Sequence, residues 1–247
     1  MRLFIIKKRF FTWLLIVCLM GICLIEFRNW NINKEKLAVE AISWAIAGRT
    51  FIIDPGHGGE DPGKVSSSGI YEKDINLAVA KKLQNLILQG GGTVYMTRNE
   101  DKALSNKEES IRARKRADLK NRAELAQSKK ADIYIALHCN SFPSERWYGA
   151  QTFYASNVPG SKELASYIQE ELVEFPGTTT RKAKIDDTTI ILKKVKIPTT
   201  NVELGFLSNS REEKMLQDDG YQNKLVWSIY SGIVRFLIKY GDQYRPT

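Results

Sequence analysis

Residues 50–59 read TFIIDPGHGG, an apolar run followed by a turn made of Asp, Pro and Gly. β-Branched and aromatic side chains favour extended backbone, so the run predicts a short, buried strand. A second apolar run, residues 133–137, leads in the same way to His138. The chain contains two histidines, His57 and His138. Both are therefore expected at the carboxyl end of a strand.

The same patterns predict the rest of the fold. Asp74 and Ser161 are predicted helix N-caps, and Gly90 is a predicted helix end. Strands that alternate with helices predict a single α/β domain with a mostly parallel, mixed central sheet flanked by helices. Open sheets of this class bind ligands at the carboxyl ends of their strands. The predicted strands are 50–53, 92–97, 131–137, 150–154, 188–192 and 199–204, and the predicted helices are 74–89, 111–129, 161–175, 211–217 and 221–240.

Residues 1–28 have the pattern of an export signal or a membrane anchor. Three basic residues at 7–9 precede an uncharged, largely apolar run at 10–25. The run has 16 residues, longer than a usual signal core and shorter than the ~20 that span a bilayer, so a removed signal and an uncleaved anchor both remain open. The basic flank would stay cytoplasmic and the rest of the chain would be exported. Residues 29–48 are expected to form a linker, and residues 49–241 one catalytic domain.

The charge distribution limits the class of partner. The formal net charge is +9, and residues 1–48 hold seven basic and three acidic residues, so nearly half of the net charge lies in that segment. Elsewhere basic residues mostly alternate with acidic ones, as between Lys107 and Arg122, which is typical of a solvated helix face. This distribution argues against a nucleic-acid partner. It suits an anionic cell wall or membrane surface.

Two histidines at one sheet edge could hold a metal if a third ligand joins them. Zinc in hydrolytic sites takes three protein ligands and leaves one position for water. Glu72 precedes a predicted helix, whereas Glu60 and Asp61 lie nearer to His57 along the chain. Spacing alone does not decide among these three carboxylates. The glycines around His57 permit close backbone approach, but no Gly-Lys-Ser/Thr follows, which excludes a P-loop.

Glu203 lies in residues 199–206, TTNVELGF, a predicted strand that is otherwise uncharged. A buried, ionised carboxylate needs a ligand, a metal neighbour or a proton to share. Desolvation would raise the proton affinity of Glu203 towards that needed for acid–base catalysis. A sheet-edge glutamate paired with a lysine is the structural alternative. Cys139 follows His138 on a predicted strand and points to the other face, which predicts a packed, inert thiol.

Five motifs occur in order between residues 50 and 240. They are DPGHGG at 54–59, EKD at 72–74 with NLA at 76–78, TR at 97–98, AD at 131–132 leading to LHCN at 137–140, and ELGFLSN at 203–209. In this order and spacing the chain resembles the zinc-dependent N-acetylmuramoyl-L-alanine amidases of the amidase-3 class. The resemblance implies that His57, Glu72 and His138 bind Zn²⁺ and that Glu203 is the catalytic residue.

The resemblance also implies a reaction and a substrate. These enzymes hydrolyse the amide between muramic acid and L-alanine of peptidoglycan, and Glu203 would take the proton of the attacking water and return it to the leaving nitrogen. Residues 147–154 and 179–184 are similar to sporulation members of the family, which prepare spore cortex for muramic-δ-lactam. That similarity implies export towards the cortex space of the forming spore.

Some features depart from this reading or leave it open. Small or hydroxylated residues are usual in the family at the positions of Ala136 and Cys139, although neither change removes a ligand. A zinc peptidase of the peptide stem and a non-catalytic wall-binding protein on the same fold are the alternatives. A protein partner of unknown identity could be needed to complete the zinc site.

Overall fold

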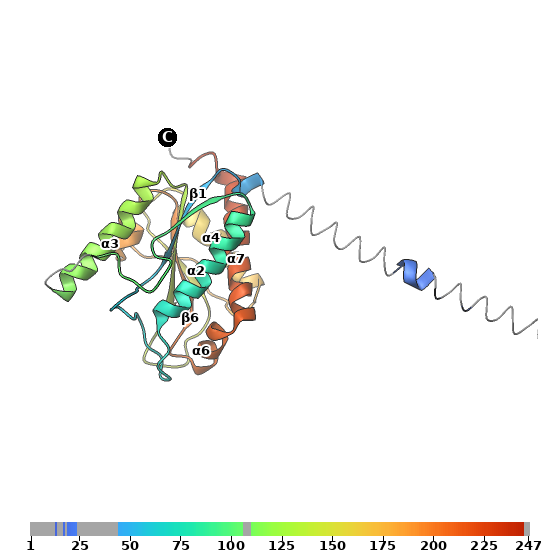
Figure 1. Cartoon of the computed structure of the whole chain (residues 1–247), viewed down its shortest axis with the longest axis horizontal. Helices are drawn as coiled ribbons and strands as arrows, with labels where there is room; N and C mark the ends of the chain where they lie inside the picture. The colour runs from blue at the N-terminus through green and yellow to red at the C-terminus, as the bar shows by residue number, and fades with distance from the viewer. Residues whose placement is uncertain (1–12, 14–16, 18, 24–43, 106–109, 245–247) are drawn as a thin grey trace, which may run out of the picture. The chain divides into compact units, whose positions relative to one another are not determined.

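The computed structural model describes residues 13, 17, 19–23, 44–105 and 110–244 (Figure 1). The folded unit that carries the candidate site is Trp44–Thr247. The predicted anchor at 1–28 and the predicted linker at 29–48 lie mostly outside the described residues. Within the described part of the chain, no helix is both long and apolar enough to cross a bilayer.

Six strands form one sheet in the order β2-β1-β3-β6-β4-β5. The pairs β1–β2, β1–β3, β3–β6 and β4–β5 are parallel, and β4 runs antiparallel to β6. The predicted mixed, mostly parallel sheet is therefore confirmed. The strands are β1 (Thr50–Pro55), β2 (Thr93–Met96), β3 (Ile133–Asn140), β4 (Gln151–Tyr154), β5 (Lys184–Ile185) and β6 (Thr199–Phe206).

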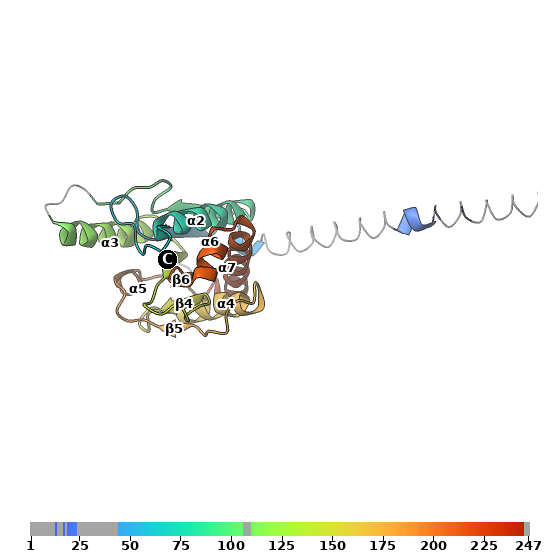
Figure 2. The same ribbon diagram turned by 90° about the horizontal axis from the view of Figure 1, so that it is seen from below.

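Helices cover both faces of the sheet. Figure 2 shows α3 and α5 on the left of the sheet and α4 and α7 on its right. On the first face, α3 and α5 pack over Ile52, Tyr134 and Ala136, because alternate residues of each strand point to the same side. On the other face, α2 and α4 contact the strands and α7 packs against both. The helices are α2 (Glu72–Gln89), α3 (Ile111–Ser128), α4 (Ser161–Glu174), α5 (Ile190–Lys194), α6 (Ser210–Gln217) and α7 (Asp219–Tyr240).

The start of α2 differs from the prediction and matters for the site. The helix begins at Glu72, so Asp74 lies in its first turn and is not the N-cap. The first free N–H groups are satisfied by loop carbonyls: Glu72 N donates to Lys64 O (2.9 Å) and Lys73 N to Pro62 O (3.2 Å). The loop before the helix thus does the work of a capping side chain, which local sequence does not reveal.

Of the two other predicted helix ends, the N-cap at Ser161 is wrong, and the end of the 74–89 helix at Gly90 is confirmed. Ser161 is the first residue of α4, and the N-cap is Gly160, whose φ is +78°. Gly90 is the C-cap of α2 with φ −76°, and the left-handed residue that ends the helix is Gly91, with φ +80°. Both left-handed positions fall on glycine because it carries no Cβ to clash there.

The strand predicted at 188–192 is wrong, because Ile190–Lys194 form α5. The Thr-Thr-Ile-Ile composition favours a strand locally. The Asp186 carboxylate instead accepts hydrogen bonds from the backbone of Thr188 and Thr189 and turns the chain, and Ile191 is then buried against the core under α3. Strand β5 was missed because its two residues are too few to show alternation.

Candidate active site

Three side chains from separate elements meet at the carboxyl edge of the sheet. Glu72 Oε1 lies 3.2 Å from His57 Nε2 and 2.9 Å from His138 Nδ1. One donor atom from each residue lies within 4.8 Å of the other two. The two imidazole rings stand nearly perpendicular, with centroids 5.0 Å apart. The described residues therefore bring the three predicted ligands into one cluster.

The parallel register of β1 and β3 explains why the two histidines meet. Pro55 pairs with Leu137, so the loop that follows β1 emerges beside His138 on β3. Gly56 packs directly against the His138 ring, because a Cβ at position 56 would stand 2.1 Å from that ring. Gly63 is also required, because its φ is +71° and a Cβ would lie 2.6 Å from Glu72 Oε2.

Glu72 is buried and fully engaged. Its Oε2 accepts a hydrogen bond from Lys64 N (2.8 Å), and its Oε1 accepts from Cys139 N (3.1 Å). Burial alone would raise the pKa of Glu72, but the hydrogen bonds and charges of His138 and His57 outweigh it and lower the pKa. The carboxylate therefore stays ionised, as a metal ligand must.

His57 is oriented from its other ring nitrogen. Its Nδ1 lies 2.8 Å from Asp61 Oδ2, which leaves Nε2 directed at Glu72. Burial lowers the pKa of His57, but hydrogen bonds to Asp61 and Glu72 outweigh burial and raise it to about 9. Of the two alternative carboxylates, Asp61 thus lies on the far side of the His57 ring, and Glu60 pairs with Arg114 on the surface. A carboxylate that holds the second nitrogen of a ligand histidine is common in metal sites.

A buried ionic network lies behind the backbone of His57. Asp54 is 1% exposed and accepts hydrogen bonds from Thr97 Oγ1 (2.6 Å), Tyr134 Oη (2.7 Å) and the Arg122 guanidinium. Burial raises the pKa of Asp54, but the Arg122 charge and these hydrogen bonds outweigh it and hold the pKa below its ordinary value. The network is charge-balanced and therefore tolerable in the core.

Two guanidinium groups bind the three successive backbone carbonyls of residues 55–57, the segment that carries His57. Arg122 donates to Pro55 O (3.0 Å) and His57 O (2.8 Å), and Arg98 donates to Pro55 O (2.9 Å) and Gly56 O (3.0 Å). His57 itself has a φ of +64°, which is unfavourable for a residue with a Cβ. The two arginines therefore stabilise the strained conformation that aims the His57 ring.

Sequence reasoning missed Arg122. Its charge run was interpreted as a solvated helix face, yet Arg122 is 2% exposed. Ion pairing with Asp118 one turn earlier on α3 looks like an ordinary surface pair in the sequence. The one available signal was that Asp54, at the end of a buried strand, requires a cationic partner.

Glu203 lies on β6 directly opposite His138 of β3. The carboxylate is partly buried, and Asn201 Nδ2 donates to its Oε1 (3.0 Å). Burial, helped by the negative charge of Glu72, raises the pKa of Glu203 above its ordinary value, although His138 and Asn201 act against this. Cys139 is buried on the other face, where burial raises the pKa of its thiol well above the usual range. The Glu203 carboxylate, with its raised pKa, therefore lies beside the cluster of His57, Glu72 and His138, and the Cys139 thiol points away from that cluster.

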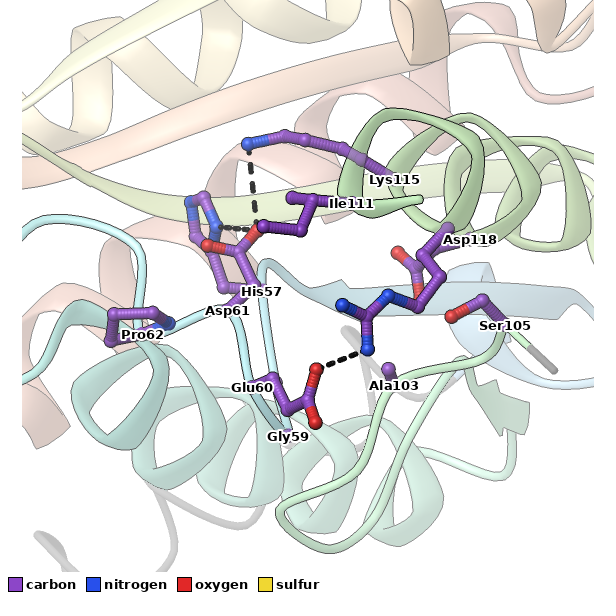
Figure 3. A pocket seen from close by; sticks show the side chains of 12 residues that line it. His57, Gly59, Glu60, Asp61, Pro62, Ala103, Ser105, Ile111, Lys115 and Asp118 are labelled. Carbon is purple, nitrogen blue, oxygen red and sulfur yellow. Dashed lines mark hydrogen bonds and ion pairs between the residues drawn. The ribbon is translucent and has the colours of Figure 1, made fainter. Parts of the chain in front are cut away.

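A cavity of about 470 Å³ opens beside His57 (Figure 3). Opposite charges pair across it: Lys115 with Asp61 at 3.5 Å, and Arg114 with Glu60. Of the three clustered residues, only His57 lines this cavity. It is lined by residues 57–62, Ala103, Ser105, Ile111, Arg114, Lys115 and Asp118.

The fold and the clustered residues together indicate a class of protein. Two imidazoles and one carboxylate at the carboxyl edge of an open α/β sheet, beside a glutamate with raised proton affinity, form a candidate metal site of the kind found in hydrolases. Residues 51–235 match the family model Amidase_3, described as N-acetylmuramoyl-L-alanine amidase. The chain therefore belongs to this amidase family.

Similar proteins and solved structures are also amidases of this kind. The chain is 38% identical over 201 residues to the "Germination-specific N-acetylmuramoyl-L-alanine amidase" of Bacillus subtilis (strain 168), which covers 81% of this chain and 84% of that protein. The fold matches the "CwlD amidase from Clostridioides difficile in complex with the GerS lipoprotein" with a TM-score of 0.75 and 42% identity, over 78% of this chain and 100% of that one. It also matches the catalytic domain of CwlV from Bacillus (Paenibacillus) polymyxa var. colistinus with a TM-score of 0.68 and 30% identity, over 77% and 98% of the two chains.

Proposed function

We propose that this protein is a zinc-dependent N-acetylmuramoyl-L-alanine amidase that hydrolyses the amide between the lactyl group of muramic acid and L-alanine in peptidoglycan. The observation that carries the proposal is the convergence of His57 Nε2, His138 Nδ1 and Glu72 Oε1, with Glu203 on the adjacent strand. Membership of the amidase family supports the reaction class. In this proposal His57, Glu72 and His138 hold the metal and Glu203 is catalytic.

The three residues fit zinc. Imidazole nitrogen and carboxylate oxygen are ligand types that zinc uses in hydrolases, and three protein ligands leave a position for water. Glu72 stays ionised, and the glycine at position 56 leaves the His138 ring room that a side chain would fill. Zinc bound there would supply a Lewis acid for the amide carbonyl and the attacking water.

The chain's own residues would handle the protons. Glu203, whose pKa is raised by burial, would accept a proton from the attacking water and deliver it to the L-alanine nitrogen as the amide breaks. Asp61 would keep the His57 ring oriented, and Arg98 and Arg122 would keep its backbone in place. The cavity beside His57 would admit part of the substrate.

The biological setting is proposed from the relatives. Identity to the germination-specific amidase supports the peptidoglycan of the spore cortex as the substrate. We also propose that removal of the stem is the step that precedes muramic-δ-lactam. We propose residues 1–28 as the export signal or membrane anchor, 29–48 as the linker and 49–241 as the catalytic domain. With this organisation the enzyme would be exported towards the cortex space of the forming spore. The complex of the CwlD amidase with the GerS lipoprotein supports a protein partner for this chain as well.

Product analysis tests the reaction. Purified spore cortex and vegetative peptidoglycan are digested with the full-length protein, with zinc supplied and with zinc removed by a chelator, and the products are identified by mass spectrometry. We expect stem peptides with a free L-alanine amine and glycans with a free muramic acid carboxyl, and both should vanish without zinc. Cleavage between two stem residues would instead identify a peptidase, and binding without cleavage would identify a wall-binding protein.

A further inference from the structure

Asn201 occupies an unusual place for an amide side chain. It lies on β6 two residues before Glu203, so the two side chains emerge on the same face of the sheet. The residue is 8% exposed. Its Nδ2 donates to Glu203 Oε1 at 3.0 Å, which is the one hydrogen bond to the Glu203 carboxylate recorded among the described residues.

The other end of the amide has no protein partner. Among the described residues, Asn201 Oδ1 is the one buried side-chain nitrogen or oxygen without a hydrogen bond. The strand register explains this, because Asn201 pairs with Ala136 on β3 and Phe153 on β4, whose side chains carry no donor. A buried acceptor without a partner lowers stability. Stability therefore does not account for an asparagine here.

The orientation of the amide follows from Glu203. Turning the amide over would bring Oδ1 against a carboxylate oxygen, which repels it, so Nδ2 faces Glu203 while that group is ionised. The orphaned Oδ1 is the consequence. Asparagine at 201 thus costs the fold a hydrogen bond and gives the carboxylate its donor.

We propose that Asn201 is a positioning residue for Glu203. It fixes Oε1 and thereby leaves Oε2 to meet the proton that Glu203 transfers. This inference rests on the proposed function of Glu203. A carboxylate held by a single donor can rotate once the donor is removed, and small misplacements of a reacting group cost rate more than binding.

The test separates rate from binding and from folding. Full-length wild type, Asn201→Leu and the control Thr200→Val are compared for kcat and KM of stem release from cortex, zinc content and Tm. Asn201→Leu should lower kcat about ten- to a hundredfold, because a hydrogen bond to a charged group is lost, with KM and zinc content unchanged. Its Tm should stay close to that of the wild type, because removal of the orphaned acceptor offsets the lost hydrogen bond to Glu203.

Thr200→Val removes a different buried hydrogen bond of the same strand, that from Thr200 Oγ1 to Phe153 O at 3.1 Å. It should lower Tm and leave kcat near the wild-type value. A wild-type kcat in Asn201→Leu overturns the proposal, as does a loss of kcat that merely accompanies a lower Tm.

Crystal structures of wild type and Asn201→Leu decide the matter independently of turnover. We expect the Glu203 carboxylate to rotate when Asn201 is replaced, and an unmoved carboxylate overturns the proposal. Absence of stem release by the wild type would count against the proposed function instead, while the position of Glu203 would still test the role of Asn201.

Discussion

The two strands beside β3 hold their site residues in opposite ways. On the β1 side, the loop of His57 is fixed by a buried network in which Arg98 and Arg122 bind three backbone carbonyls. On the β6 side, Glu203 stands on a strand of otherwise uncharged residues and receives one hydrogen bond, from Asn201. At the same edge of the sheet, the His57 loop is therefore held by many charged hydrogen bonds, whereas the Glu203 carboxylate is held by one.

This difference matches two kinds of chemistry. A metal ligand needs a fixed position and a fixed protonation state, and Glu72 has a lowered pKa because two imidazoles offset its burial. A general base must exchange protons, and Glu203 has a raised pKa because its partners do not offset burial. Two glutamates near each other therefore take opposite pKa shifts from their surroundings.

The largest expected effect comes from removing the carboxylate of Glu203, the proposed catalytic residue. Glu203→Gln should lower the rate of stem release about 10²–10⁴-fold, because proton transfer is lost, while zinc content stays at the wild-type level. His57→Ala, on the other side of the cluster, should instead lower zinc content. Elemental analysis and product release measure both. Turnover retained by Glu203→Gln would remove Glu203 from the catalytic role.

The buried network predicts a large effect on stability. Arg122→Met should lower the free energy of unfolding by about 3–5 kcal/mol, because Asp54 is left buried without its cation. Arg114→Met, on the same helix, breaks only a surface pair with Glu60 and should cost under about 1 kcal/mol. Denaturant unfolding compares the two, and equal losses would contradict the distinction between them.

The orientation of His57 predicts an intermediate effect. Asp61→Asn replaces the carboxylate at Nδ1 by a weaker acceptor and should reduce zinc affinity about 10–100-fold, measured by competition with a chelator. Glu60→Gln is the matched control, because Glu60 is adjacent in sequence but pairs with Arg114. Unchanged affinity in Asp61→Asn would leave Asp61 without a role in metal binding.

The smallest expected effect is a pH dependence of stability with a sign set by Glu203. Its pKa is raised on folding above the ordinary value of about 4.3, so its ionisation destabilises the fold as pH rises through the folded pKa. Glu203→Gln should therefore gain stability over the wild type at neutral pH, and the gain should vanish below about pH 4.3. Unfolding of chelator-treated protein between pH 4 and 7 measures this. A gain that grows towards acid would show that the pKa of Glu203 is lowered instead.

Much of the fold followed from local pattern. The runs at 50–53, 92–97, 131–137, 150–154 and 199–204 each contain or overlap a strand, because apolar alternation and β-branched content report on burial residue by residue. The run at 188–192 failed because a side-chain turn at Asp186 and burial against α3 outweigh strand propensity.

The candidate site was also predicted only in part from local sequence. His57 and His138 could be placed from sequence because each follows an apolar strand, and Glu203 because it interrupts one. The choice among Glu60, Asp61 and Glu72 could not be made from spacing. It depends on where α2 begins, and that is set by the Pro62 and Lys64 carbonyls in the loop that precedes the helix.

The sequence by itself determined which residues are candidates for the chemistry and at which end of the strands they lie, because strand and helix periodicity are local properties of the chain. Only the tertiary structure decided which carboxylate faces the two imidazoles, that Arg122 is buried behind His57, and that Asn201 supports Glu203. The contacts of Arg122 with His57 and of Glu72 with His138 join segments 60 or more residues apart, so they depend on helix packing and sheet register. The environment of Asn201 depends on how β6 pairs with its neighbouring strands. Local sequence patterns do not report on sheet register or on helix packing.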